Sequence, residues 1–245
     1  MIRVSGREYN GLIESSCYLN GEMTCLSCHK MHKASDDERS LEQWADDQLK
    51  RIASDDQACL QCHQSKQYGP EHTHHLVGSS GSSCYNCHMP HTAYGLLKGI
   101  RNHKISSPDV GKDLAANRPN ACNLCHLDKT LAWSAENLRD WYSIDPPDLD
   151  QDQERVAASL LWLLRGNAAD RALVAWHMGW KEAQHASGNH WLVPFLSSLL
   201  DDQYDAIRLI ARRSIQSIPG SEDFELDVVT SSTSQDRMEA GMDLM

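Results

Sequence analysis

Eight of the nine cysteines in this 245-residue chain form C-x-x-C pairs, and a histidine follows each pair directly. The four motifs are CLSCH (Cys25, Cys28, His29), CLQCH (Cys59, Cys62, His63), CYNCH (Cys84, Cys87, His88) and CNLCH (Cys122, Cys125, His126). This pentapeptide is typical of covalent c-type haem attachment. Two thiols one helical turn apart can reach the two vinyl groups of a porphyrin, and the next residue can offer an imidazole nitrogen to the iron. The sequence therefore predicts four covalently attached haem c groups, with four proximal iron ligands: His29, His63, His88 and His126.

Three other kinds of site also use C-x-x-C pairs. Zinc ribbons give no reason for a histidine after every second cysteine, and eight thiolates with four imidazoles exceed two zinc sites. A thioredoxin-type motif would occur once, near a βαβ pattern that this sequence lacks. A disulfide framework would not need one repeated spacing. Haem attachment is therefore the interpretation that we adopt. Cys17 lies outside the motifs, and we expect it to be a partly buried free thiol, with an unusual ligand or an intermolecular cross-link as the alternative.

Nine further histidines could supply the second axial ligand of each iron. Six of them lie in the cysteine-containing part of the chain: His32, His72, His74, His75, His91 and His103. Four irons with two imidazoles each need four of these six, so bis-histidine ligation is possible throughout. A histidine that is not a ligand would instead hydrogen-bond a haem propionate.

Spacing favours four of the six as distal ligands: His32, His75, His91 and His103. His32 and His91 each follow a proximal histidine by three residues, so each stays on the same side of its own ring and can point to a neighbouring haem. His103 follows His88 by fifteen residues, so the chain between them can fold over a ring.

The run HTHH at residues 72–75 is expected to give one ligand, and we favour His75 over His74. Methionine is the other candidate axial ligand and would raise the reduction potential. Met31 and Met89 follow a proximal histidine too closely to reach the opposite face of the same ring, and Met23 precedes Cys25 by only two residues. We therefore expect imidazole pairs and low potentials.

Composition changes just after the last motif. Residues 1–128 carry 13 Lys and Arg and 15 Asp and Glu, whereas residues 129–245 carry 10 and 19. We expect a tetrahaem cytochrome c domain over residues 1–128, a helical domain over 129–220 and an acidic disordered tail over 221–245. The formal net charge of -11 argues against a nucleic-acid binder held by phosphate contacts. The longest apolar run is too short for a transmembrane segment.

The expected fold is mainly α. In the haem part, residues 34–56 are predicted to form one amphipathic helix with Leu41, Trp44 and Leu49 facing inward, and residues 76–83 to form a flexible loop. The porphyrins themselves would fill much of the interior and would be required for folding.

The later part follows a 3.6-residue hydrophobic period, which predicts five helices. The first hydrophobic markers of four of them are Leu131, Val156, Leu173 and Leu192, and Asp201 and Asp202 can cap the fifth. Short helices joined by tight turns suggest stacked helix pairs. We expect His177, His185 and His190 to lie on helix surfaces. No catalytic triad is visible here, so a packing or docking module is the favoured interpretation.

Together the two parts resemble the multihaem c-type cytochromes with paired CxxCH motifs that end in a HEAT-like helical module. The resemblance rests on CLSCHKMH, on CYNCHMPHTAYGLLKGIRNHKISSP, on NACNLCHLDKTLAWSAENL and on WLVPFLSSLLDDQYDAIRLIARRSIQSIPG. It implies electron transfer in the periplasm or at the cell surface, and bis-histidine ligation by residues such as His32, His91 and His103. It also implies redox partner proteins, such as other cytochromes or a membrane complex that oxidises quinol.

An electron carrier is the leading functional hypothesis, because closely packed haems can pass electrons without any acid–base residue. The alternative is a multihaem reductase or oxidase of small nitrogen or sulfur compounds, which needs one iron with an open position. Every motif ends in histidine, so the CxxCK signature of nitrite-reducing relatives is absent. A docking subunit whose helical part grips a redox partner is a third possibility, compatible with the first.

Covalent haem is attached outside the cytoplasm, so a signal peptide is expected. The opening MIRVSGREYNGLIESS lacks a charged region followed by an apolar one. Our hypothesis is that Met1 is an internal methionine of a longer protein, which would carry an export signal and could carry further haems upstream.

Overall fold

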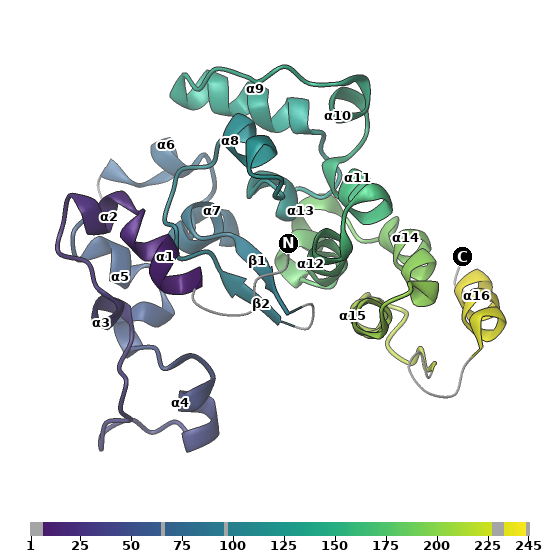
Figure 1. Ribbon diagram of the computed structural model, residues 1–245, viewed down its shortest axis with the longest axis horizontal. Helices are drawn as coiled ribbons and strands as arrows, with labels where there is room; N and C mark the ends of the chain where they lie inside the picture. The colour runs from purple at the N-terminus through teal and green to yellow at the C-terminus, as the bar shows by residue number, and fades with distance from the viewer. Residues whose placement is uncertain (1–6, 65–66, 96–97, 227–232, 244–245) are drawn as a thin grey trace. The chain divides into compact units, whose positions relative to one another are not determined.

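The computed structural model describes residues 7–64, 67–95, 98–226 and 233–243 (Figure 1). It is mainly helical with one two-stranded sheet, which confirms the predicted mainly α class. The chain divides into two compact units. The three-motif unit comprises the described residues up to Pro90 together with Arg101–Ser107, and the helical unit comprises His91–Ile100 and the described residues from Pro108 onward. Within the described ranges, no helix has the length and apolar character that a bilayer crossing requires.

Short helices and turns make up the three-motif unit. Its elements are α1 (Arg7–Ile13), α2 (Ser16–Leu19), α3 (Cys25–Cys28), α4 (Leu41–Asp47), η1 (Arg51–Ser54), α5 (Gln57–Leu60), α6 (Pro70–Thr73), η3 (Ser80–Ser82) and α7 (Cys84–His88). Helices of one or two turns are not stable in isolation, because the cost of nucleation is spread over few hydrogen bonds. Their stability must therefore come from what packs against them.

The single helix predicted over residues 34–56 is wrong. Only α4 and η1 form there, and α4 ends at Asp47, before Gln48, which adopts a left-handed conformation with φ 53°. A left-handed residue with a side chain cannot continue a right-handed helix. Leu41, predicted to face inward, is 68% exposed. Leu49 instead pairs with His29 in an isolated antiparallel bridge.

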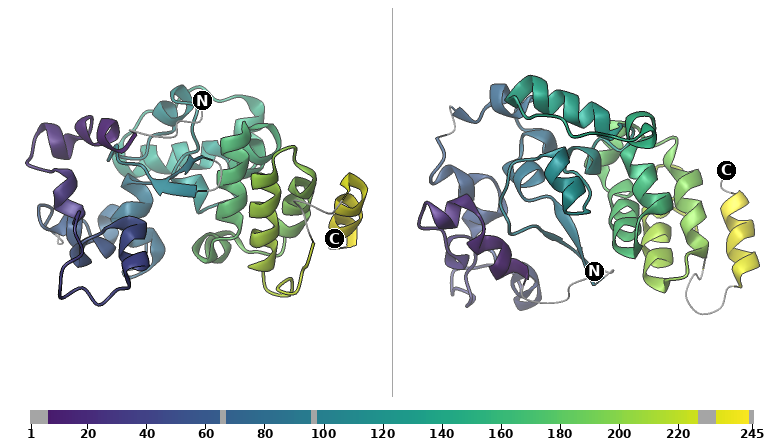
Figure 2. Two further views of the ribbon diagram at one scale, coloured as in Figure 1. Left: turned by 60° about the horizontal axis from the view of Figure 1, so that its bottom comes forward. Right: turned by 45° about the horizontal axis from the view of Figure 1, so that its top comes forward.

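Longer helices form the helical unit. Its helices are α8 (Val110–Ala115), η4 (Cys122–Leu124), α9 (Leu131–Tyr142), α10 (Gln151–Arg155), α11 (Ala158–Arg165), α12 (Ala168–Met178), α13 (Lys181–Ser187), α14 (Leu192–Ser198), η5 (Leu199–Asp201), α15 (Asp205–Gln216) and α16 (Ser234–Asp243). Strands β1 (His91–Tyr94) and β2 (Lys98–Arg101) form the sheet. The five helices predicted from the hydrophobic period are confirmed as α9, α11, α12, α14 and α15. Helix α12 packs against α11 and α15, and α15 packs against α14 (Figure 2).

The core of the helical unit is apolar and well filled. Its fully buried side chains include Leu127, Leu163, Val174, Met178, Leu192, Leu196, Leu200, Ile207 and Ile215. A second, smaller cluster joins Val110, Leu131, Ala135, Leu138 and Ala158. This burial stabilises the helical unit through the hydrophobic effect, whereas the short helices of the three-motif unit bury little apolar surface.

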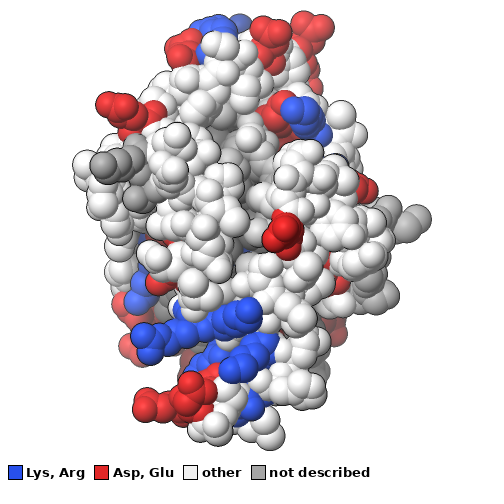
Figure 3. Space-filling view, turned by 90° about the vertical axis from the view of Figure 1, so that its left-hand side faces the viewer, with Lys and Arg blue, Asp and Glu red and all other residues white. Residues whose placement is uncertain are grey.

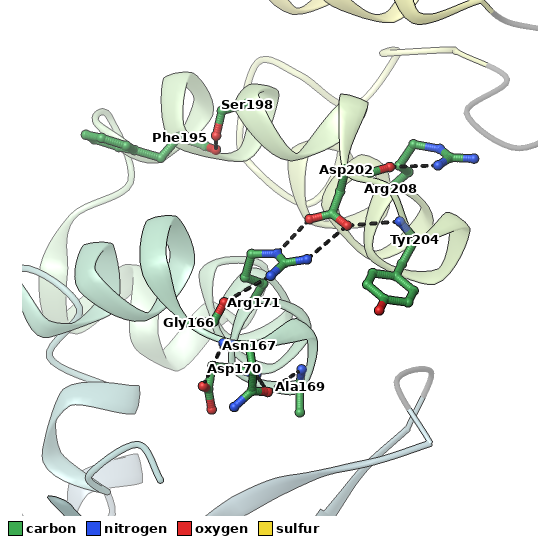
Figure 4. A network of polar contacts seen from close by, with 10 residues as sticks. All are labelled: Gly166, Asn167, Ala169, Asp170, Arg171, Phe195, Ser198, Asp202, Tyr204 and Arg208. Carbon is green, nitrogen blue, oxygen red and sulfur yellow. Dashed lines mark hydrogen bonds and ion pairs between the residues drawn. The ribbon is translucent and has the colours of Figure 1, made fainter. Parts of the chain in front are cut away.

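One ion-pair network connects α12 to the start of α15 (Figure 4). The Arg171 guanidinium donates to both carboxylate oxygens of Asp202, at 2.7 and 3.2 Å, and to the Gly166 carbonyl at 2.9 Å. Asp202 also accepts from the Tyr204 backbone N–H at 3.0 Å, and its own carbonyl accepts from Arg208 at 2.7 Å. Because the Arg171 and Asp202 side chains are largely buried, this bidentate pair fixes the approach of the two helices.

The structure divides the chain elsewhere than at the predicted break after residue 128. The fourth motif belongs to the helical unit, because Leu127, directly after it, lies in the main apolar core. Residues 221–245, predicted as an acidic tail, include helix α16 and two hydrophobic residues next to the core. Phe224 and Leu226 pack against the core, and α16 is held by Arg237, which pairs with Asp201 at 2.9 Å.

Candidate functional site

Each CxxCH motif is folded into about one helical turn. The backbone N–H of the histidine donates to the carbonyl of the first cysteine in three of them: His29 to Cys25 at 2.9 Å, His63 to Cys59 at 3.0 Å and His126 to Cys122 at 2.8 Å. In the remaining motif, all five residues form helix α7. All nine cysteines are thiols, and all lie among the described residues. The motifs therefore hold two thiols and one imidazole close together, as haem attachment requires.

The imidazole of His103 lies opposite that of His29. The two ring centres are 6.1 Å apart, and the ring planes differ by 17°. His103 Nδ1 lies 2.9 Å from the Arg101 carbonyl oxygen. This contact fixes the ring and leaves Nε2 as the nitrogen that could bind a metal. Burial, and to a lesser extent the neighbouring His29, lowers the pKa of His103, which favours the neutral imidazole that binds metals.

A second imidazole pair joins His72 and His88. Their ring centres are 6.0 Å apart, and the planes differ by only 4°. His88 Nδ1 lies 3.2 Å from the Ser106 carbonyl oxygen. Burial lowers the pKa of both imidazoles. This pair has the same construction as the first one, with one proximal histidine and one backbone carbonyl that orients a ring.

The spacing of both pairs fits a metal ion between the rings. With a metal–nitrogen bond of about 2 Å and about 1.1 Å from that nitrogen to the ring centre, two imidazoles on opposite sides of one ion have centres about 6 Å apart. Ring pairs in ordinary aromatic contact cover a range of about 4.5–7 Å, which includes this separation. The His29–His103 and His72–His88 pairs therefore have the separation that bis-histidine ligation of one iron needs.

The N-terminal helix holds the His103 segment in place. The buried Ser15 hydroxyl lies 3.1 Å from the His103 carbonyl and accepts from the Ile105 N–H at 2.9 Å. Gly11 lies so close that a Cβ there would stand 2.6 Å from the Lys104 backbone nitrogen. This close approach requires glycine and fixes the position of residues 103–105 against α1.

The second and third motifs meet at Asp56. One carboxylate oxygen of Asp56 accepts from the Cys84 N–H at 2.9 Å and from the Ser83 hydroxyl at 3.1 Å. The neighbouring Cys84 thiol, together with burial, raises the pKa of the Cys59 thiol. The first cysteines of two motifs are thus in contact, so cofactors attached at them would be neighbours.

The three-motif unit has almost no apolar core of its own. Among its described residues, the buried hydrophobic side chains are those of Leu12, Ala53 and Ala58. Large hydrophobic side chains are instead exposed: Tyr9, Tyr18, Leu19, Leu26, Met31, Leu41, Ile52, Leu76 and Val77. Charged side chains are sparse over much of the molecular face in Figure 3. A porphyrin would bring the apolar surface that this unit lacks, so its composition and packing fit a bound haem.

The fourth motif is held by buried polar side chains of the helical unit. Asn120 accepts from the Cys122 N–H at 3.0 Å and donates to Asp113 at 2.7 Å. Asn123, inside the motif, accepts from the Ser134 hydroxyl at 2.7 Å. The Ser187 hydroxyl lies 2.9 Å from the Cys125 carbonyl. These bonds attach the motif to α8, α9 and α13.

His91 lies in an aromatic environment within the helical unit. Its ring centre is 4.8 Å from Trp176, 5.4 Å from His177 and 5.9 Å from Trp180. His177 was expected on a helix surface, and that prediction is wrong, because it is only 2% exposed.

The other predicted ligands are placed differently. His32 is exposed. The His63 ring has Tyr68 edge-on at 5.1 Å. His75, the favoured residue of the HTHH run, has Nδ1 2.5 Å from the Thr73 carbonyl, whereas His72 of the same run forms the pair with His88. Spacing could not choose between them, because the choice depends on the end of α6 at His74, which has φ 55°.

No family model, curated protein or solved structure matches this chain in the three comparisons with known proteins. In the described part of the chain, no three His, Cys, Asp or Glu side chains converge as a protein-only metal site requires.

Proposed function

We propose that this protein is a multihaem c-type cytochrome that transfers electrons through four covalently attached haems. The observation that carries the proposal is the pair of imidazole–imidazole separations, 6.1 Å for His29 with His103 and 6.0 Å for His72 with His88. Both pairs include the histidine of a CxxCH motif, so the sequence pattern and the side-chain geometry support the same chemistry. Haem, when bound, supplies one-electron oxidation and reduction.

Different residues of the chain would attach the haems and bind their irons. The motif cysteines would hold the haem covalently, and the motif histidines would each offer one imidazole to the iron. His103 serves the first motif and His72 the third. In the helical unit, His126 of the fourth motif would offer a proximal imidazole, and His91, which lies in the same unit, would be a distal ligand. The second ligand for the His63 site is open among His32, His74 and His75.

The proximity of the second and third motifs supports electron transfer between haems rather than redox chemistry at isolated haems. The thiols of Cys59 and Cys84, the first cysteines of the second and third motifs, are neighbours. Asp56 stabilises this arrangement by accepting hydrogen bonds from the third motif while it precedes the second. Haems held at such neighbouring positions would supply electron transfer without proton transfer by a side chain, so no acid–base residue would be required.

The finer architecture also belongs to this proposal. The stacked helices α11, α12, α14 and α15 support a HEAT-like helical domain attached to a tetrahaem cytochrome. A location in the periplasm or at the cell surface, and redox partners such as other cytochromes or a quinol-oxidising membrane complex, follow from covalent haem chemistry and from the family resemblance.

One observation favours the alternative of a reductase or oxidase of small nitrogen or sulfur compounds. His63 is exposed, and the ring that the structure places edge-on to it at 5.1 Å is the phenol of Tyr68 rather than an imidazole. For that alternative, the second motif is the candidate open position.

The absorption and paramagnetic resonance spectra of the ferric protein test the proposal. An electron carrier with bis-histidine ligation gives wholly low-spin haem that does not bind cyanide. A high-spin fraction that binds cyanide or nitrite and disappears in a variant of the second motif would instead support the enzyme. Protein without haem would refute both.

A further inference from the structure

Helix α12 and the turn after it surround the imidazole of His91 with three rings. Trp176 and His177 come from α12, and Trp180 precedes α13. All three meet His91 at steep angles: 67° for Trp176, 60° for His177 and 85° for Trp180. Helix α12 also packs directly against β1, the strand that carries His91. We call Trp176, His177 and Trp180 the ring wall. Strand β1 and the ring wall belong to the same compact unit.

The ring wall is fixed by the core of the helical unit. His177 is almost fully buried, and Trp180 packs against the main apolar cluster. Gly179 lies between His177 and Trp180 in the chain. It is so close to α15 that a Cβ there would stand 2.9 Å from Ser214 Cα. The Ser217 hydroxyl donates to the Gly179 carbonyl at 3.0 Å. Neither the helix end nor the turn can move without disturbing α15.

A two-stranded hairpin is a poor support for a metal ligand on its own. Such hairpins are at best marginally stable in water. An axial ligand must be held within a few tenths of an ångström of its position. Packing against rigid rings supplies what the hairpin lacks, because it restricts the rotamers of His91 and excludes water from one side of the imidazole.

We infer that Trp176, His177 and Trp180 are positioning residues for His91 as an axial haem ligand, and that the helical unit is thereby part of a haem site. The inference rests on the proposed function. It assigns the helical unit a role besides docking of a partner, since α12 sets the orientation and the dielectric surroundings of one ligand. Those surroundings are levers on the reduction potential.

The test compares Trp176→Ala with Trp141→Ala in the holoprotein. Trp141 is a matched control, because it lies on α9 of the same unit and is 37% exposed, against 38% for Trp176. Each variant is titrated with a reductant while the haem absorbance is recorded. Trp176→Ala is expected to retain four haems. About one quarter of the absorbance change, from the one haem of four that His91 would bind, is expected to move to a lower reduction potential, because added water stabilises the charged ferric state. Trp141→Ala is expected to match the wild type.

Two further variants connect the shift to His91. His91→Ala is expected to turn about one quarter of the ferric haem high-spin, since one ligand of one iron is lost. His177→Gln is expected to stay low-spin but to change the resonance spectrum of one haem, and Trp176→Phe to restore most of the wild-type potential.

The inference is overturned if Trp176→Ala and His177→Gln both titrate like the wild type, or if the His177 variant and not His91→Ala becomes high-spin. Wild-type protein without haem would instead refute the proposed function, and this outcome is separate, because haem is counted before any titration.

Discussion

Replacing Gly11 with alanine should disturb one haem ligand from a distance. The added Cβ would stand 2.6 Å from the Lys104 nitrogen and 2.9 Å from the His103 carbonyl carbon, whereas ordinary van der Waals contacts begin at 3.4 Å. Both neighbours are backbone atoms, so no flexible side chain can yield. The segment that carries His103 must therefore move away from α1 by about 0.8 Å, which is the difference between the 3.4 Å of an ordinary contact and the 2.6 Å to the Lys104 nitrogen.

A displacement of this size exceeds what an iron–imidazole bond tolerates. Metal–ligand distances are held to within about 0.2 Å, so the shift is about four times the allowed range. We expect the His103 ligand to be lost from the first motif in a large part of the molecules. The ferric protein should then contain up to about one quarter high-spin haem, since one of four sites is affected.

The assay is the ferric absorption spectrum together with paramagnetic resonance, after the haem content has been measured. Gly69→Ala is the matched control, because a Cβ at Gly69 meets no atom within 4 Å. His103→Ala should give the same high-spin quarter as Gly11→Ala. If Gly11→Ala retains four haems that are entirely low-spin, with unchanged potentials, the coupling between α1 and the His103 ligand is refuted.

Three further predictions follow from other parts of the molecule. Arg171→Ala should lower the free energy of unfolding by about 3 kcal/mol, because it leaves the buried Asp202 carboxylate without its bidentate partner; denaturant unfolding with unchanged haem content measures this, and a loss near zero would contradict it. His72→Ala should turn about one quarter of the ferric haem high-spin through loss of the His88 partner; if only His75→Ala does so, the pairing is wrong. Cys17→Ser should retain four haems and the wild-type spectrum in the intact-mass and absorption measurements, since that thiol lies outside the motifs; a missing haem would show that it takes part in attachment.

The sequence predicted those features that depend on local pattern. Hydrophobic residues at helical spacing identified α9, α11, α12, α14 and α15, because α11, α12, α14 and α15 bury one apolar face in the main core and α9 buries one in the smaller cluster. The CxxCH motifs were recognised by composition and spacing alone.

Features that depend on long-range packing were not predictable in this way. The helix expected over residues 34–56 fails because Gln48 adopts a left-handed conformation, which nothing in the local sequence requires. His177 was assigned to the surface because a single histidine at a helix end carries no signal of burial. Its position became evident only when β1 was placed against α12.

The boundary of the helical unit illustrates the same limit. Cysteine content suggested a break after the fourth motif, yet Leu127 and Asn123 are buried in the helical unit. Composition records which residues are present, whereas the boundary depends on the core that each residue joins.

Counting haem in the intact protein tests the central claim most directly. The full chain is produced in a host with the haem attachment machinery, and its denatured mass is compared with a pyridine haemochrome assay. We expect four haem masses added to each polypeptide and retained after denaturation, with four haems per chain by absorbance. A polypeptide of unmodified mass and without haem absorbance would contradict it.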